Sequence, residues 1–235
     1  MALPALRRPD TARYALVLLL ILCTVGFQLA APDTDWARFA TVLLQAATLG
    51  LALNLGHIHG LLDRVLIALV VGAVTVSAVA LFGFASLGVL DARVINLLLI
   101  AFAPIAIVAG MLDDMRRRSR VTVRTIIGVL SVYLLIGLMF TFVYGIVGSR
   151  SHAGFFGASE QSLTSDYLYF SYATLTTVGY GDLTTPLRVG RSLAILEALI
   201  GQIYLVSVVS LIVGNLGRSP SGGVAPQPRT GRRLG

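Results

Sequence analysis

The sequence predicts an all-α membrane protein with six transmembrane helices and one shorter re-entrant helix, and its composition is the first reason. Of 235 residues, 56% are hydrophobic and only 12% are charged, whereas soluble domains carry about 25% charged residues. The mean hydropathy is +0.86. A soluble fold with so little charge would expose a largely apolar surface, so the composition argues against a cytosolic globular enzyme.

Apolar stretches long enough to cross a bilayer are the second reason, because a helical span takes about 20 residues. Six occur, at residues 14–31, 37–56, 63–86, 94–112, 122–148 and 190–215. The first follows a basic start and ends at Ala30 and Ala31, as a cleavable signal peptide does. Its apolar run is longer than such peptides have, so we expect a retained span.

Charge distribution predicts the orientation. All 18 basic residues are arginines, and the net charge is +7. With a cytoplasmic N-terminus, 13 arginines fall on the inner side and five on the outer side, in agreement with the positive-inside rule. We therefore expect a multi-pass protein of the cell membrane with both termini in the cytoplasm. The cluster Arg116–Arg124 is expected to meet anionic headgroups, and no nucleic-acid partner is expected.

The segment between the last two spans differs from the rest. Residues 149–165 are polar and rich in Gly and Ser, which predicts an extracellular turret loop. Residues 165–176, SDYLYFSYATLT, follow as a helix too short to span. We expect Ser165 to be its N-cap and Asp166 to lie in its first turn. Such a helix is tolerated at membrane depth only when it is buried in protein or faces water.

The short helix leads into Thr176-Thr177-Val178-Gly179-Tyr180-Gly181-Asp182. A pore that selects K+ replaces the ion's hydration shell with backbone oxygens. Aligning successive carbonyls on one axis requires left-handed dihedrals at alternate residues, and Gly179 and Gly181 have that spacing. The Thr177 hydroxyl adds an oxygen, while Val178 and Tyr180 can pack behind the strand. One chain supplies one wall, so four chains, a homotetramer, are expected to form the pore.

This run, TTVGYGD, resembles the signature of the potassium channel family, and the similarity extends over about 50 residues of the C-terminal part. The resemblance implies an outer helix, pore helix, filter and inner helix within residues 122–215. It implies that K+ binds at Thr177, Val178, Gly179 and Tyr180, with Gly181 completing the filter. The implied activity is passive K+ conduction without enzymatic chemistry, and K+ is the permeant ion rather than a cofactor.

Two departures from the family concern support of the filter. Tyr169 and Phe170 stand where many members have two tryptophans, and Ala173 stands where some have a carboxylate. We expect the Tyr169 hydroxyl to bond Asp182 and brace the filter. Thr176, beside the filter, is a further support residue.

The inner helix carries the remaining candidate residues. Gly201 resembles the family's gating hinge, although a small residue for close helix packing is the alternative. Leu205, Val209 and Val213 follow on the same face and are expected to line the cavity. Glu197 is the acidic residue within a span, which is costly unless it is paired or functional. We expect it to brace the pore helix from behind; a proton-sensitive element and a simple hydrogen bond to Ser or Thr are the alternatives.

The predicted organisation has five parts. They are a cytoplasmic N-terminus (1–13), a four-helix sensor-like domain (14–112), a cytoplasmic linker (113–121), the pore domain (122–215) and a disordered cytoplasmic tail (216–235). The span at 94–112 contains no arginine, so we expect gating to be nearly independent of voltage. His57 and His59 are expected to be turn residues rather than metal ligands. A weakly selective cation channel, an accessory subunit of a potassium transport complex and a transporter subunit stay open as alternatives.

Overall fold

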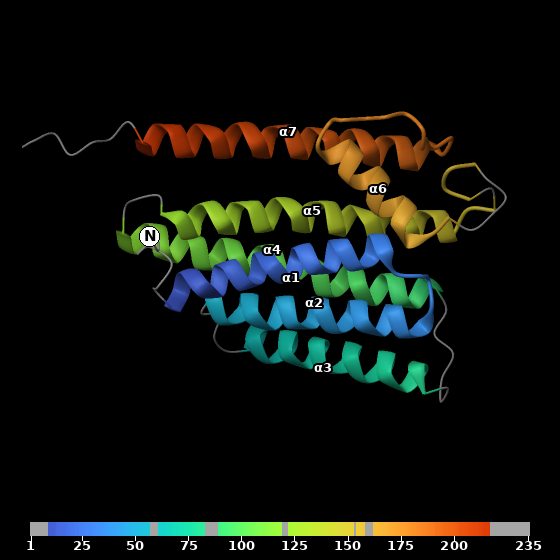
Figure 1. Ribbon diagram of the computed structural model, residues 1–235, viewed down its shortest axis with the longest axis horizontal. Coiled ribbons are helices and arrows are strands. Elements are labelled where there is room, and N and C mark those ends of the chain that lie inside the picture. Colours follow the sequence, from blue (N-terminus) through green and yellow to red (C-terminus); the bar gives the residue numbers. More distant parts are fainter. Residues whose placement is uncertain are drawn as a thin grey trace, which may run out of the picture.

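The computed structural model describes residues 9–56, 61–82, 89–118, 122–152, 154–157 and 162–216. Within them every regular element is an α-helix, as expected for an all-α membrane protein. The helices are α1 (Pro9–Ala30), α2 (Asp35–Gly56), α3 (Leu61–Leu81), α4 (Val89–Arg118), α5 (Val123–Ser149), α6 (Thr164–Leu175) and α7 (Arg188–Leu216). Figure 1 shows the long helices running side by side, with the short α6 crossing obliquely between α5 and α7.

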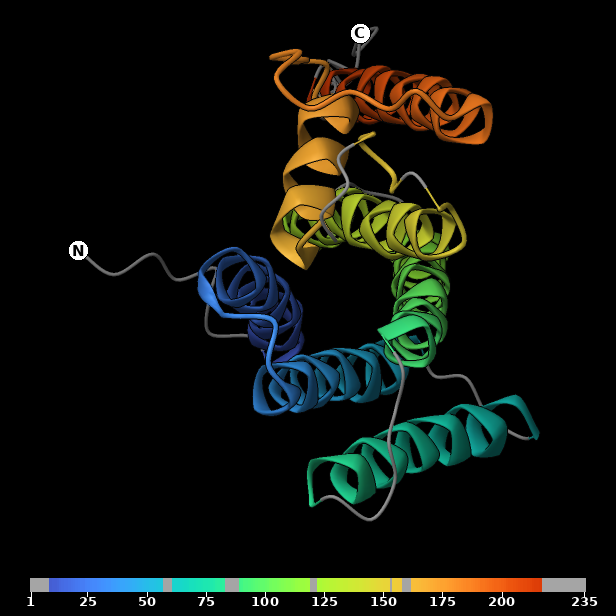
Figure 2. The same cartoon turned by 90° about the vertical axis from the view of Figure 1, so that its right-hand side faces the viewer.

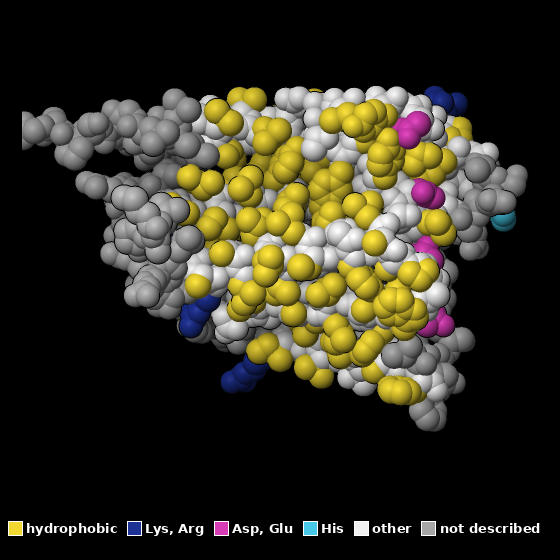
Figure 3. All heavy atoms as spheres, viewed as in Figure 1, with side chains coloured by type: hydrophobic (Ala, Val, Ile, Leu, Met, Phe, Trp, Pro, Cys, Tyr) yellow, Lys and Arg dark blue, Asp and Glu magenta, His cyan; other side chains and the backbone are white. Residues whose placement is uncertain are grey.

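Four of the described helices, α1, α2, α5 and α7, are long and apolar enough to cross a membrane, by length and composition. In α3 and α4 the stretches whose side chains the structure describes, at residues 64–79 and 93–109, are apolar but shorter than 18 residues. In Figure 3 hydrophobic side chains cover most of the visible face, and acidic side chains gather toward the end that carries the filter. This distribution suits a protein whose sides contact lipid.

Several helix ends follow from local chemistry. Proline is favoured as the first helical residue because its missing N–H has no partner there in any case, and α1 begins at Pro9. Asp35 places a negative charge in the first turn of α2. At the start of α5, the Thr125 hydroxyl accepts a 3.3 Å hydrogen bond from the Thr122 N–H. Helix α4 continues to Arg118, so it includes residues that the sequence suggested as linker.

Helices α1 to α4 form a four-helix group that packs on α5 and α6. Helix α4 packs on α5 and α2, and α1 packs on α2, α5 and α6. Figure 2 shows α1, α2, α4 and α5 forming an arc, with α3 outside it against α2. The main core lies between these helices and includes Val17, Leu49, Leu99 and Leu135, which are almost fully buried.

Several predictions lie outside the described residues. These are the residues His57 and His59, most of the N-terminal segment 1–13, and the tail beyond 216. The side chains of Arg116–Arg118 and Val213 are also outside them. The boundaries of the five predicted parts therefore stay predictions.

Candidate functional site

Alternating left-handed backbone marks the segment after the pore helix α6. The φ angles of Thr177, Gly179 and Gly181 are 60°, 53° and 81°. Thr177 is the non-glycine residue with positive φ in the described part of the chain. Left-handed dihedrals are unfavourable for residues with a Cβ, and such outliers concentrate at functional sites. The alternation is the pattern expected of a strand whose carbonyls face one side.

The end of α6 holds the inner part of this segment by hydrogen bonds. The Thr177 N–H donates to the Thr174 carbonyl at 3.0 Å, and the Gly179 N–H donates to the Ala173 carbonyl at 3.1 Å. The Thr176 hydroxyl bonds back to the Tyr172 carbonyl at 2.6 Å. Ala173 therefore contributes through its backbone, although it lacks the carboxylate that some channels have there.

The N-cap prediction for Ser165 is wrong. Helix α6 begins one residue earlier, at Thr164, and its N-cap is Leu163. A leucine side chain cannot accept a hydrogen bond. Instead the Asp166 carboxylate accepts the Leu163 N–H at 2.9 Å. Asp166 thus lies in the first turn as expected, and it takes over the capping that was assigned to Ser165.

Tyr169 and Phe170, which stand where many family members have two tryptophans, face different surroundings. The Tyr169 hydroxyl lies 2.9 Å from Asp182 Oδ2, and its ring stacks on that of Tyr180 at 6.0 Å. Phe170 instead packs edge-on against Tyr144 at 5.1 Å. The expected contact between Tyr169 and Asp182 is therefore present in the structure, and its effect on conduction stays a prediction.

Glu197 lies at the junction of α5, α6 and α7 and is fully buried. The Tyr144 hydroxyl donates to its Oε2 at 2.5 Å, and Ser171 Oγ lies 2.5 Å from its Oε1. Ser171 Oγ also lies 2.7 Å from the Gly137 carbonyl. A serine hydroxyl has one hydrogen, so it donates to only one of these two acceptors at a time. Glu197 thus links the inner helix to the pore helix and the outer helix.

Gly201 allows the inner helix to approach the end of the pore helix closely. A Cβ at this position would lie 2.5 Å from the Leu175 carbonyl oxygen, which is too short for any side chain. This contact supports the packing interpretation of Gly201, and α7 continues through it without interruption. A hinge at this residue stays a prediction.

The other inner-helix candidates face outward in the single chain. Leu205 and Val209 are exposed, which is compatible with a cavity wall or with lipid. Gln202 Nε2 donates to the Thr177 hydroxyl at 3.4 Å. That bond connects the inner helix directly to the filter.

Part of the predicted turret is packed rather than solvated. Phe155 is fully buried and contacts the rings of Tyr144, Tyr167 and Phe170. After the filter, the Thr185 hydroxyl bonds the Phe155 carbonyl at 2.7 Å. The turret therefore anchors the chain on both sides of the filter.

The sequence offers a serine or threonine as a hydrogen-bond partner of Glu197, but it identifies neither Ser171 nor Tyr144 as the residues concerned. Tyr144 and Ser171 stand 53 and 26 residues away from it, and nothing in their local sequence marks them. The one available signal was that a tyrosine and a serine fall within apolar helices, where a buried carboxylate needs hydrogen-bond donors.

The filter segment is open on one side in the single chain. Val178 is 53% exposed and Tyr180 is 71% exposed. The inner helix also presents an apolar face, with Leu199, Ile203 and Val206 exposed. Among the described residues, no group of three or more His, Cys, Asp or Glu could hold a metal ion.

Comparison with known proteins finds matches to the C-terminal part of the chain. A family model described as "Ion channel" matches residues 128–217, which include α6, the filter and α7. Protein LctB of Bacillus caldotenax is 44% identical over 87 residues, 34% of this chain and 64% of that protein. Protein LctB of Geobacillus stearothermophilus is 38% identical over 82 residues, 32% of this chain and 60% of that protein.

The match spans less than two thirds of the length of these curated relatives. No solved structure matches the chain. The matched region coincides with the outer helix, the pore helix, the filter segment and the inner helix. Residues 128–217 are therefore similar to an ion channel family.

Proposed function

We propose that this protein is a potassium-selective channel that conducts K+ passively across the cell membrane. The observation that carries the proposal is the alternation of positive φ angles at Thr177, Gly179 and Gly181. This backbone brings successive carbonyl oxygens to one side, where they replace the hydration shell of K+. The ligands are the backbone oxygens of Thr177 to Tyr180 and the Thr177 hydroxyl.

Assembly as a homotetramer is part of the proposal. One chain supplies one wall of the filter, and its Val178 and Tyr180 side chains are half or more exposed. Exposed aliphatic residues on the inner helix provide an apolar surface for neighbouring subunits. In the assembled pore, four α6 helices direct the negative ends of their dipoles at the cavity and stabilise a cation there. Anionic headgroups are expected at the cytoplasmic Arg116–Arg124 segment.

Current through the purified protein in planar bilayers tests the proposal. With K+ on one side and Na+ on the other, the reversal potential is expected to lie close to the value for a membrane that is permeable to K+ alone. Tyr180→Asp is expected to move it toward zero, because the charged side chain hydrates the outer filter. The control is Tyr14→Phe, a substitution in α1 far along the chain from the filter.

A reversal potential near zero for the unmodified protein would favour the weakly selective cation channel instead. No current from the purified chain, with current only in the presence of a second protein, would favour the accessory subunit. Mass measurement of the detergent complex is expected to give four copies, and a conducting dimer would contradict the tetramer.

A further inference from the structure

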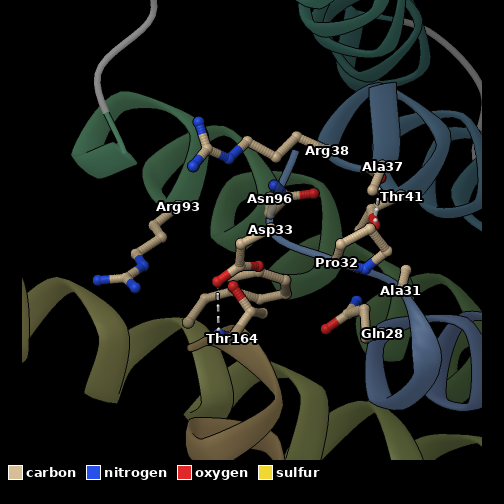
Figure 4. Close-up of a pocket in the computed structure, with 11 residues that line it drawn as sticks. Gln28, Ala31, Pro32, Asp33, Ala37, Arg38, Thr41, Arg93, Asn96 and Thr164 are labelled. Atoms are coloured by element: carbon tan, nitrogen blue, oxygen red, sulfur yellow. Dashed lines mark hydrogen bonds between the residues drawn. The ribbon is translucent and has the colours of Figure 1, made fainter. Parts of the chain in front are cut away.

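A polar pocket lies where the four-helix group meets the start of the pore helix. It has a volume of about 50 Å³, several times the 10–15 Å³ that one water needs. Its polar lining comes from α1, α2, α4 and α6 and from the loop between α1 and α2, through Gln28, Asp33, Arg38, Thr41, Arg93, Asn96 and Thr164. Figure 4 shows Arg38 and Arg93 on one side, Gln28 and Thr41 on the other, and Asp33 and Asn96 between them.

Gln28 is the observation that points to a ligand. Its side chain is 5% exposed, and neither amide atom has a hydrogen-bond partner among the described residues. A buried amide without partners costs about 1–3 kcal/mol, so its presence at the pocket wall calls for a polar occupant. An amide both donates and accepts, as a hydroxyl group requires.

The charges around the pocket define the rest of the occupant. Arg38 is partly exposed at the rim, where its Nη1 also lies 3.2 Å from Asp35 Oδ1. Arg93 is buried on the same side and already donates to the Gly145 carbonyl and Ser149. Asp33 adds one carboxylate, which accepts the Thr164 N–H at 3.1 Å. The remaining guanidinium donors of Arg38 favour a phosphate at the rim, and Arg93 adds a positive charge behind it, whereas Asp33 disfavours a second negative charge deeper inside. A phosphodiester that carries a neutral hydroxylated group satisfies both conditions.

The level of the pocket in the membrane indicates that its occupant comes from a lipid. Trp36, in the first turn of α2, is 52% exposed and packs edge-on against Phe27. Exposed tryptophans at helix ends mark the level of lipid headgroups. Its neighbour Ala37 lines the pocket. We propose that this pocket binds the headgroup of an anionic lipid of the phosphatidylglycerol type, with its phosphate at Arg38 and its glycerol hydroxyls at Gln28.

The bound headgroup would lie against the contact through which the four-helix group holds the pore helix. Asp33 bonds the first residue of α6, and Arg93 lies 4.9 Å from the centre of the Tyr167 ring in the same helix. The bound phosphate lies near the arginines and the bound hydroxyls lie near Asp33. The headgroup therefore holds Asp33 and Arg93 in their contacts with α6. The lipid therefore stabilises the position of α6.

Trp36, the single tryptophan of the chain, provides a binding assay that needs no current. The full-length protein is reconstituted in phosphatidylcholine vesicles containing brominated phosphatidylglycerol or brominated phosphatidylcholine, and Trp36 quenching is measured. Phosphatidylglycerol is expected to quench more strongly. Gln28→Leu is expected to weaken this preference about fivefold, the equivalent of one hydrogen bond, and Arg38→Gln is expected to reduce it further at low salt.

Matched controls separate the pocket from general effects. Gln45 is also buried with both amide atoms unpartnered among the described residues, but it lines a separate cavity of about 10 Å³. Gln45→Leu is therefore expected to keep the preference. Arg13→Gln removes an exposed arginine from α1 about four turns before Gln28 and is expected to keep it as well.

Soluble ligands distinguish a lipid from a free phosphate ester. If glycerol 3-phosphate relieves the quenching but inorganic phosphate does not, the pocket recognises a glycerol phosphate ester, and the free ester is then a second source beside the lipid. If neither competes, the lipid is the source. Equal quenching by both brominated lipids in the unmodified protein overturns the proposal, even if the variants fail to fold. So does a preference that Gln28→Leu and Arg38→Gln leave unchanged.

Discussion

Removing the carboxyl group of Glu197 is expected to destabilise the channel, whereas replacing it with an amide is not. In Glu197→Gln the amide oxygen accepts from the Tyr144 hydroxyl, and the amide N–H donates to Ser171 Oγ. The single Ser171 hydrogen is then free to donate to the Gly137 carbonyl. All three contacts, which measure 2.5, 2.5 and 2.7 Å, can therefore be kept.

The expected magnitude for Glu197→Leu follows from which groups lose their partners. Ser171 keeps the Gly137 carbonyl as an acceptor, so only the Tyr144 hydroxyl is left without one. A buried hydroxyl without a partner costs about 1–3 kcal/mol, which is roughly a 5- to 150-fold shift in an equilibrium. Tyr144→Phe removes that hydroxyl, so the double variant Glu197→Leu with Tyr144→Phe is expected to regain part of the stability.

Thermal dissociation of the detergent complex, followed by size-exclusion chromatography, measures this effect. The expected order of stability is unmodified protein and Glu197→Gln together, then the double variant, then Glu197→Leu. If Glu197→Gln were as unstable as Glu197→Leu, the junction would need a negative charge, and the explanation from hydrogen-bond donors and acceptors would be wrong. If Glu197→Leu were as stable as the unmodified protein, the junction would not depend on Glu197 at all.

Three further predictions follow from the same structure. Gly201→Ala places a Cβ 2.5 Å from the carbonyl that ends the pore helix, so it should lower the dissociation temperature, whereas Gly72→Ala, which meets no atom within 4 Å, should not. Tyr169→Phe removes the 2.9 Å bond to Asp182 and should speed inactivation in macroscopic current decays without affecting assembly; unchanged decays would count against the brace. Open probability should be nearly constant between strongly negative and positive voltages, because residues 94–112 contain no arginine, and a steep sigmoid would contradict this.

Features encoded by local sequence could be predicted, and contacts between distant segments could not. The short helix of residues 165–176 was predicted within one residue of α6, since an apolar run of that length between two spans has few other structures. Gly179 and Gly181 indicated the left-handed positions, but Thr177 did not, because its φ of 60° opposes the preference of threonine. Ser165 was misassigned because a serine before a helix is a common N-cap, whereas here Asp166 reaches back to Leu163.

The arrangement of the first four helices shows the same limit. Their hydrophobic pattern predicts helices but not which of them contacts the pore. In the structure α1 packs on both the outer helix and the pore helix, and Asp33 bonds the pore helix across 131 residues of sequence. A single exposed aspartate in a short loop carries no local sign of that partner.

Arg93 is the physical reason to expect that voltage does not move α4, even though this arginine lies near one end of the helix. Its Nη1 donates to the Gly145 carbonyl at 2.6 Å and to the Ser149 hydroxyl at 2.5 Å. Hydrogen bonds of a charged group are worth about 1.5–3 kcal/mol each, so breaking both costs roughly 3–6 kcal/mol. Carrying one charge across the whole membrane yields about 2.3 kcal/mol per 100 mV, and a displacement from one end yields less. We therefore expect Arg93 to keep α4 fixed to the outer helix, and the four-helix group to hold the pore helix in place instead of sensing voltage.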